Sequence, residues 1–255
     1  MARTASTSGE THLVYGVRPV REVLEHRPDQ IHHLSVARER RDQTAHELVQ
    51  EAKLRGIPVH VEPKEALTRK AGTSQHQGIV AVISPVAYGR LEELVENPVA
   101  RALLVDGVED PRNLGALLRT AEAAGVGAVL LPHRRTVGVT PTVVKASAGA
   151  AFHLRFVRTG NVAETLSKLA EAGYETIGLD LGGTENPPES TGGRPWVLVV
   201  GSEGSGLRRL VRERCSYLLR LPMCGKVRSL NVSVAAGIAM YRLAFPALWS
   251  RREEA

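Results

Sequence analysis

From residue 101 onward the chain alternates between short apolar segments and longer segments with helical periodicity. The predicted strands lie near residues 102–105, 128–131, 153–157, 175–180, 196–200 and 216–221. The predicted helices lie near residues 113–124, 141–148, 161–172, 205–213 and 231–243. Strand–helix alternation of this kind builds a mainly parallel sheet with helices on both faces. The sequence therefore predicts an α/β fold for this part of the chain.

A smaller α/β unit is predicted for residues 12–84. Its expected helices lie near residues 19–26, 43–55 and 65–70, and its expected strands near 31–36, 57–61 and 78–84. The acidic, Pro-containing stretch 85–98 is expected to be a linker or a short helix, and the polar residues 1–11 are expected to be disordered. The sequence thus predicts two domains, at 12–84 and 99–249, joined by that linker.

Polar residues occupy three of the predicted strand-to-helix junctions. They are the segments Asp106–Asn113, Gly201–Gly206 and Ser229–Ser233. Because parallel strands end at one edge of a sheet and ligands bind beyond that edge, the three segments are expected to converge. We therefore predict one composite active site formed by residues far apart in the sequence.

Two known nucleotide-binding motifs are less favoured as interpretations of these turns. A dinucleotide-binding fold places G-x-G-x-x-G at its first strand–helix turn, whereas Asp106–Asn113 contains a single glycine. The glycines of Gly201–Gly206 have other spacings, and the segment lacks the Lys-Ser/Thr pair of a phosphate-binding P-loop.

The same three segments carry a resemblance to a known family. Asp106–Ala121, Val200–Leu207 and Leu221–Ser233 are similar to the three motifs of the SpoU/TrmH family of the SPOUT superfamily, in order and at family spacing. The segments Val14–Val20 and His76–Ile79 resemble the branch of that family with an added substrate-binding domain. That branch methylates a guanosine ribose of 23S rRNA at the 2′-oxygen.

The resemblance implies a trefoil-knotted α/β methyltransferase domain that forms a homodimer and uses S-adenosyl-L-methionine. In the family, the loops of the second and third motifs grip the cofactor largely through backbone, which points to Gly201, Leu221 and Leu230 here. Glycine permits close backbone approach and leucines offer apolar surface to an adenine. The alternative for all three residues is a purely structural role in a turn and in the core.

Methyl transfer to a hydroxyl is an in-line displacement that needs alignment and loss of the hydroxyl proton. The resemblance implies that Arg119 activates the ribose 2′-hydroxyl. Because a guanidinium stays protonated and is a poor base, we expect Arg119 to orient a substrate phosphate and stabilise the developing alkoxide. Asn113 is expected to contribute to catalysis or to act as a helix N-cap.

Three further residues are predicted to be catalytic. Glu203 lies between glycines and is expected to hold Arg119, or another arginine, by a charge-assisted hydrogen bond, although it could also cap the next helix. Ser229 and Asn231 alternate along the last junction and are expected to bind the ribose or a phosphate. The alternative role for Ser229 or Asn231 is a simple helix cap.

The charge of the chain favours an anionic partner. The net charge is +6, and from Gly201 onward ten Lys or Arg residues stand against four Asp or Glu. The cluster Arg208–Arg214 with Lys226 and Arg228 is expected to bind RNA phosphates, with Arg18 and Arg21 extending the track. The predicted partner is RNA, with 23S rRNA favoured and tRNA, another rRNA site or a non-catalytic RNA-binding role as alternatives.

The sequence also indicates in which cellular compartment the protein is expected. No apolar run reaches the length that crosses a bilayer, and the N-terminus lacks an apolar signal segment, so no membrane partner is expected. Cys215 and Cys224 are expected to be small buried hydrophobes in a reducing cytoplasm. The nine histidines form no zinc-like spacing, and no metal is expected.

Overall fold

The structure is a computed structural model and describes residues 11–185, 193–202, 204–227 and 229–248. The chain divides into two compact units. Unit 1 comprises the residues up to Val86 together with Val139–Phe152, and unit 2 comprises Ala87–Gly138 and the residues from His153 onward. Among the described residues, no helix has both the length and the apolar character needed to cross a bilayer.

Unit 1 is built on a four-stranded sheet with the order β1-β4-β2-β3. The sheet is mixed, because β4 runs antiparallel to both of its neighbours while β2 and β3 are parallel. Its strands are β1 (His12–Tyr15), β2 (Ile31–Ala37), β3 (Val59–Glu62) and β4 (Ile79–Ile83). Its helices are α1 (Val17–His26), η1 (Pro28–Gln30), α2 (Gln43–Leu54), α3 (Lys64–Ala71) and α6 (Pro141–Ala146), and η2 (Ala150–His153) follows α6.

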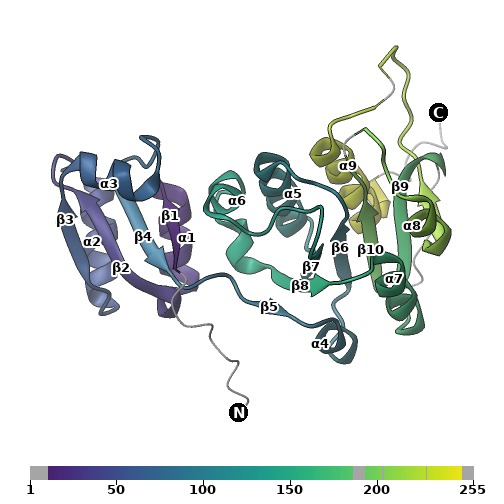
Figure 1. The fold of residues 1–255 in the computed structure, drawn as a ribbon, viewed down its shortest axis with the longest axis horizontal. Helices are drawn as coiled ribbons and strands as arrows, with labels where there is room; N and C mark the ends of the chain where they lie inside the picture. Colours follow the sequence, from purple (N-terminus) through teal and green to yellow (C-terminus); the bar gives the residue numbers. More distant parts are fainter. Residues whose placement is uncertain (1–10, 186–192, 203, 228, 249–255) are drawn as a thin grey trace. The chain divides into compact units, whose positions relative to one another are not determined.

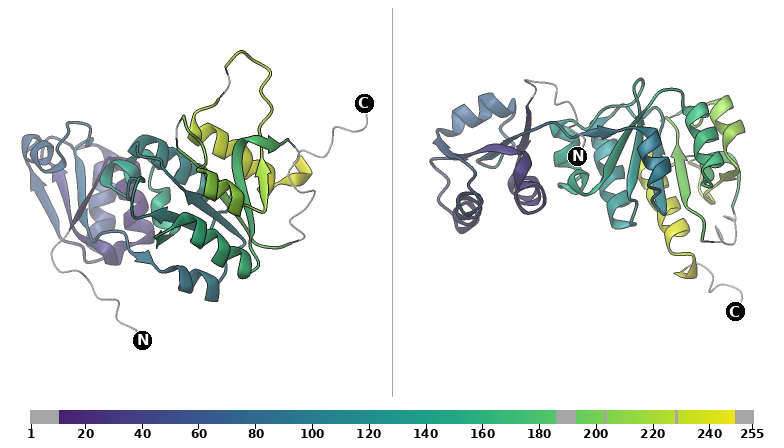
Figure 2. Two further views of the ribbon diagram at one scale, coloured as in Figure 1. Left: turned by 45° about the vertical axis from the view of Figure 1, so that its right-hand side comes forward. Right: turned by 90° about the horizontal axis from the view of Figure 1, so that it is seen from below.

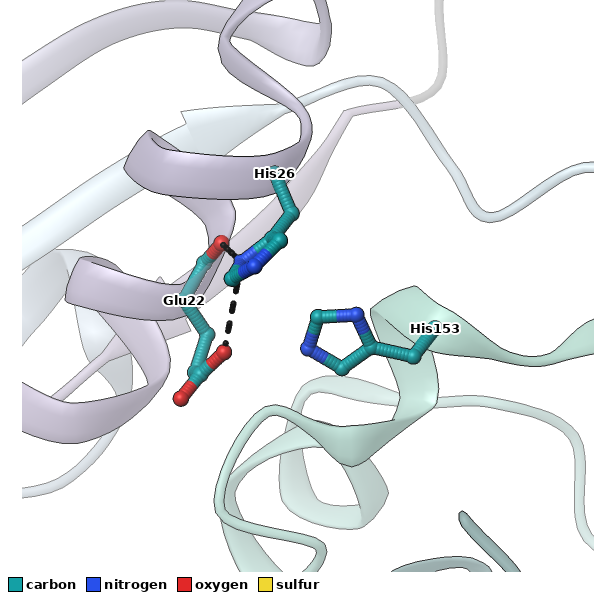
Figure 3. Close-up of side chains that lie close together, drawn as sticks. All are labelled: Glu22, His26 and His153. Atoms are coloured by element: carbon teal, nitrogen blue, oxygen red, sulfur yellow. Dashed lines mark hydrogen bonds and ion pairs between the residues drawn. The ribbon is translucent and has the colours of Figure 1, made fainter. Parts of the chain in front are cut away.

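Helix α1 shows how the sequence pattern places a helix against this sheet. Val20, Val23 and Leu24 recur at helical spacing and are fully buried, which fixes one face of α1 to the core. On α1 itself, Glu22 and His26 lie one turn apart, and their side chains approach to 3.4 Å (Figure 3). His26 Nδ1 also lies 3.2 Å from the backbone oxygen of Glu22.

A buried histidine holds the turn that leads into β4. His76 has no exposed surface, and its Nδ1 accepts a hydrogen bond from the Gly78 N–H at 3.0 Å. Its Nε2 lies 3.0 Å from Thr68 Oγ1, whose own proton goes to the Lys64 carbonyl. These partners require the neutral ring with the proton on Nε2. Burial, and after it the charges of Lys64 and Lys145, holds the pKa of His76 below its usual 6.5.

The stability of the fold is therefore expected to fall as pH falls below about 6.5. In that range the unfolded chain takes up a proton on His76 that the folded chain excludes, so acid favours unfolding. We expect His76→Gln to lose about 1–3 kcal/mol at neutral pH and to show a smaller pH dependence. Urea unfolding at neutral and at mildly acidic pH measures both effects. His46→Gln, at an exposed position on α2, is the matched control and should behave like wild type.

Unit 2 contains a seven-stranded sheet in which all neighbouring strands are parallel, in the order β11-β9-β10-β6-β7-β8-β5 (Figure 1). Its strands are β5 (Tyr88–Gly89), β6 (Arg101–Val105), β7 (Ala128–Pro132), β8 (Arg155–Thr159), β9 (Glu175–Thr184), β10 (Trp196–Val200) and β11 (Tyr217–Leu219). Its helices are α4 (Leu91–Glu96), α5 (Pro111–Ala123), α7 (Val162–Glu171), α8 (Arg209–Arg214), α9 (Val232–Ala244) and η3 (Pro246–Leu248).

Helices cover both faces of this sheet, as the alternation in the sequence predicts. Helices α5 and α9 pack against each other on one face, while α7 and α8 pack on the other (Figure 2). On the second face, alternate residues of the central strands join one buried cluster with α4, α7 and α8, which includes Leu104, Val199, Leu166 and Val211. The predicted α/β fold with a parallel sheet is confirmed.

The segment 85–98, expected to be a linker or a short helix, contributes to unit 2 from Ala87 onward. Its residues Tyr88–Gly89 form β5 at the edge of the sheet, and Leu91–Glu96 form α4. Leu94 of α4 is fully buried in the cluster described above. The short helix that the sequence analysis left open is α4, which buries an apolar face and exposes an acidic one.

Candidate active site

A cavity of about 410 Å³ lies beyond the carboxyl ends of β9 and β10. It has the volume of a small-molecule site. Its wall is formed by parts of β9, β10 and α8, by the loops after β10 and β11, and by the start of α9. The lining residues are Leu179, Asp180, Leu181, Val200, Gly201, Ser202, Gly204, Ser205, Gly206, Arg212, Leu221, Met223, Ser229, Leu230, Asn231, Val232 and Ala235. The cavity thus includes five of the eight predicted site residues.

The loop after β10 presents backbone to this cavity. A Cβ atom on Gly201 would lie 2.2 Å from the backbone carbon and oxygen of Gly206, so only glycine fits there. Ser202 and Gly206 form a two-way backbone bridge, with N–O distances of 3.2 and 3.0 Å. Gly206 has φ 65°, in the left-handed region. The loop folds back on itself and lines the cavity with main-chain atoms.

The loop after β6 packs directly on the loop after β10. The Asp106 N–H donates to the Val200 carbonyl at 2.8 Å. Gly107 has φ 92°, and a Cβ there would lie 2.8 Å from Ser202 Cβ. Two of the three polar segments predicted to converge are therefore in contact, although nearly a hundred residues separate them.

The third segment joins the first through a pair of asparagines. Asn231 Nδ2 donates to Asn113 Oδ1 at 3.0 Å, across 118 residues of sequence. Asn231 is also the N-cap of α9, because its Oδ1 accepts from the Ser233 N–H at 2.9 Å. Asn231 is therefore both the helix cap that the sequence analysis gave as an alternative and a residue of the cavity wall.

The expectation that Asn113 caps a helix is wrong. Helix α5 starts two residues earlier, with Pro111 in its first position and Asp110 as N-cap, and the Asp110 carboxylate accepts from the Arg112 N–H at 2.7 Å. Proline is favoured at the first helical position, and aspartate is among the preferred residues at the N-cap before it. The side chain of Asn113 is directed instead to Asn231.

The loop between β11 and α9 supplies three further predicted site residues. Leu221 is buried, Leu230 is 40% exposed, and Ser229 is exposed. All three line the cavity. Apolar side chains and polar groups therefore alternate along this wall, which suits a ligand that has both an apolar ring and polar substituents.

Arg119 and Glu203 remain predictions. Arg119 lies on α5 with its side chain exposed, and it does not line the cavity. Within the part of the chain that the structure describes, it has no hydrogen bond or ion pair. Glu203 lies outside the described residues.

Two buried carboxylates beside the cavity were missed by the sequence analysis. Arg208 donates to both oxygens of Asp106, at 2.9 and 3.0 Å, and Arg212 donates to Asp180 at 2.9 Å. The Asp106 side chain is 4% exposed and that of Asp180 is 5% exposed. The sequence did contain a signal for such a pair, because Asp180 lies within the apolar strand β9. A carboxylate buried in a strand needs a positively charged or hydrogen-bonding partner.

These pairs change the expected role of the basic cluster. Arg208 and Arg212 compensate buried acids, Arg209 pairs with Glu213 at 2.7 Å, and Arg220 pairs with Glu185 at 3.0 Å. Three of the arginines expected to bind RNA phosphates, Arg208, Arg209 and Arg212, therefore already have carboxylate partners. The expected residue Arg228 lies outside the described residues.

The two cysteines differ from each other. Cys215 is half-buried against β9, and burial, followed by the nearby Asp180 carboxylate, raises its pKa to about 12. Its thiol therefore stays protonated at neutral pH and is not a nucleophile. Cys224 is exposed, so the expectation that both are buried is wrong for this residue, which lies on the loop after β11.

The fold and the cavity together define an α/β protein that binds a small molecule at the carboxyl edge of a parallel sheet, with a wall that includes glycine-rich backbone and Asn231. Residues 100–241 match the SpoU rRNA Methylase family, and residues 13–89 match the RNA 2′-O ribose methyltransferase substrate-binding family. The chain belongs to the SpoU rRNA methylase family, and its first domain to the substrate-binding family.

Individual proteins agree with this assignment. The chain is 42% identical over 246 residues to the 23S rRNA (guanosine-2′-O-)-methyltransferase RlmB of Pseudomonas aeruginosa, covering 90% of this chain and 94% of that protein. It is 39% identical to RlmB of Bordetella pertussis, covering 91% and 96%. The fold is similar to that of the SpoU methyltransferase AviRb from Streptomyces viridochromogenes in complex with AdoMet, with a TM-score of 0.77, 24% identity and coverage of 97% and 95%.

Proposed function

We propose that this protein transfers a methyl group from S-adenosyl-L-methionine to a ribose 2′-hydroxyl of ribosomal RNA, at a guanosine of 23S rRNA. The observation that carries the proposal is one cavity lined by the second and third family segments, with the first family segment in contact with both. Relatives that share about two fifths of its residues over nearly their whole length are 23S rRNA guanosine-2′-O-methyltransferases.

The cavity fits the cofactor. Its volume of about 410 Å³ suits a nucleoside joined to an amino acid. Leu221 and Leu230 offer apolar surface for an adenine, and the backbone around Gly201 offers amides and carbonyls for its polar edge. Asp180 would place a carboxylate near a positively charged ligand, although Arg212 shares that carboxylate.

The bound cofactor would supply an activated methyl carbon for the 2′-oxygen, and the hydroxyl proton would pass to water or to a neighbouring group. The protein has to hold the ribose in line with that methyl group. Asn231, fixed by its cap and by Asn113, presents a rigid amide at the cavity wall, and Ser229 adds a hydroxyl. We assign both to the ribose. Arg119 stabilises the developing alkoxide, and Glu203 orients that guanidinium.

Methyl incorporation tests this function directly. The protein is incubated with radiolabelled S-adenosylmethionine and either a 23S rRNA transcript or total tRNA, and the modified position is mapped by mass spectrometry. We expect label in 23S rRNA as a 2′-O-methylguanosine. Label confined to tRNA would reassign the substrate.

A non-catalytic RNA-binding role makes a different prediction. A protein that kept the fold only as a scaffold would not bind S-adenosylmethionine. Isothermal titration with the cofactor in the absence of RNA distinguishes the two roles, and absence of binding would refute the enzymatic proposal.

The two domains have separate functions. Residues 12–84 bind the RNA substrate, which agrees with the family match of residues 13–89, and the residues from 99 onward carry the transfer. We further infer that the loops beginning at Gly201 and Leu221 form the trefoil knot implied by the family. Action on ribosomal RNA places the protein in the cytoplasm.

We also propose that the protein is a homodimer through α9. This helix buries Ala236, Ala239 and Met240 but exposes a second apolar face. Val234, Ile238 and Tyr241 form that face at helical spacing, and each is 37–50% exposed. A helix that is apolar on both sides requires a partner, and a two-fold contact lets α9 meet its copy.

Ile238→Glu is therefore expected to convert the dimer to monomers. A charge buried on both sides of a two-fold contact appears twice in the interface, so its cost is doubled. Sedimentation equilibrium measures the change. Leu54→Glu, at an exposed apolar position on unit 1, is the matched control and should leave the dimer intact. A wild-type protein that sediments as a monomer would contradict the proposal.

A further inference from the structure

Unit 2 contains a second cavity, of about 440 Å³, beside the carboxyl end of β8. Its wall includes Arg158 and Thr159 at the end of β8, and Gly160 and Asn161 at the start of α7. It shares no lining residue with the candidate active site. Nothing in the proposed mechanism uses this cavity.

Thr159 is the first sign that a ligand belongs there. The residue is 3% exposed, and its Oγ1 is buried with no hydrogen-bond partner among the described residues. Buried hydroxyls are nearly always paired, because an unpaired one loses its hydrogen bonds to water without replacement. Because Thr159 lines the cavity, rotation of its side chain would let this hydroxyl pair with an acceptor that enters the cavity.

Arg158 supplies a positive charge that no carboxylate neutralises within the described residues. Its guanidinium lies 4.2 Å from the centre of the Tyr88 ring and donates to the Pro132 carbonyl at 3.1 Å. The other charged groups on the wall are engaged with one another or with neighbours: Arg90 with Glu93 at 3.5 Å, Lys168 with Glu92 at 3.9 Å, and Glu164 with Asn161 at 3.2 Å.

The N-terminus of α7 adds donors of its own. This helix has ten residues, and Asn161 caps it by accepting from the Ala163 N–H at 2.9 Å. The first turn of a helix has further N–H groups without intrahelical partners, and its dipole favours a negative charge. A hydroxyl, a guanidinium and a helix N-terminus are together the donors that a phosphate binds.

We propose that this cavity binds a backbone phosphate of the RNA substrate, away from the methylated nucleotide. The identity of the ligand rests on the proposed function. In the sheet order, β8 stands three strands from β10, or about 14 Å. All of these strands point the same way, so the two cavities open at one edge of the sheet. A few nucleotides of RNA span that distance, and the phosphate contact fixes the register of the strand at the active site.

A phosphate titration tests the site without requiring catalysis. Backbone amide resonances of Gly160, Val162 and Glu164 are followed by NMR as inorganic phosphate is added, with sodium chloride at matched ionic strength as reference. We expect these resonances to shift with phosphate only. Thr159→Val, which keeps shape and removes the hydroxyl, should weaken phosphate binding about tenfold without lowering the unfolding temperature. Absence of phosphate-specific shifts would overturn the proposal.

Equilibrium binding of a 23S rRNA transcript at several salt concentrations identifies the source of the phosphate. Arg158→Gln is expected to weaken RNA binding and to reduce the slope of log K against log salt by about one, whereas Thr159→Val weakens binding equally at all salt concentrations. Arg155→Gln is the matched control, because Arg155 is at the opposite end of β8 and also donates to backbone carbonyls.

The RNA assignment is wrong if phosphate shifts the amides while Arg158→Gln and Arg155→Gln bind RNA equally. A wild-type protein that binds RNA and phosphate but transfers no methyl group would instead refute the proposed activity and leave this site standing. The two proposals therefore fail separately.

Discussion

Arg119→Ala is expected to lower kcat for RNA methylation by about 10²–10³-fold while leaving the affinity for S-adenosylmethionine unchanged. The second part follows from the structure, because Arg119 does not line the cavity assigned to the cofactor. The first part follows from the chemistry, since the ribose oxygen gains negative charge as its proton leaves, and a fixed guanidinium stabilises that charge. Single-turnover methylation with saturating RNA measures the rate, and calorimetry measures cofactor affinity.

Two further variants locate the origin of this effect. Arg119→Lys keeps the charge without the planar fork, so partial activity is expected if charge stabilisation dominates. Arg112→Ala removes an exposed arginine from the first turn of the same helix and should change kcat little. Wild-type turnover in Arg119→Ala would remove this residue from the mechanism.

The fold followed from local patterns because strands and helices bury residues at fixed periods. Apolar runs such as Trp196–Val200 are buried throughout and lie in the middle of the sheet. The edge elements were less predictable. Strand β1 (His12–Tyr15) and the two-residue strand β5 (Tyr88–Gly89) depend on pairing with distant strands, and so short a segment carries no periodicity of its own.

The candidate site was predictable only in part. The family resemblance pointed to Gly201 and a junction of polar residues pointed to Asn231, and both residues line the cavity. Contacts between residues that are distant in the sequence could not be predicted from local sequence patterns. The bond from Asn231 to Asn113 depends on how α9 packs on α5, where Gly237 lets Thr120 approach within 3.2 Å of the position its Cβ would take. Likewise, no spacing rule relates Arg208 to Asp106, so arginines that hold buried acids looked like free RNA-binding charges.

Gly201→Ala is expected to weaken binding of S-adenosylmethionine by about 10–100-fold, because overpacking of this kind costs about 1–3 kcal/mol. The added methyl group would lie 2.2 Å from the backbone of Gly206 and 2.6 Å from the Leu207 nitrogen. Neither atom belongs to a flexible side chain, so the loop itself must move. Since that loop forms the cavity wall, the movement displaces the main-chain groups that we assign to the cofactor.

The matched control for this variant is Gly225→Ala, on the loop between β11 and α9. Among the described residues, and apart from its two chain neighbours, no atom lies within 4 Å of the position of its Cβ, so the substitution adds the same methyl group without displacing the cavity wall. We expect it to bind the cofactor like wild type. Titration calorimetry compares the two variants, and circular dichroism verifies that both are folded. Equal cofactor affinity in Gly201→Ala and wild type would show that the cofactor does not depend on this wall, and it would move the cofactor site away from the loop after β10.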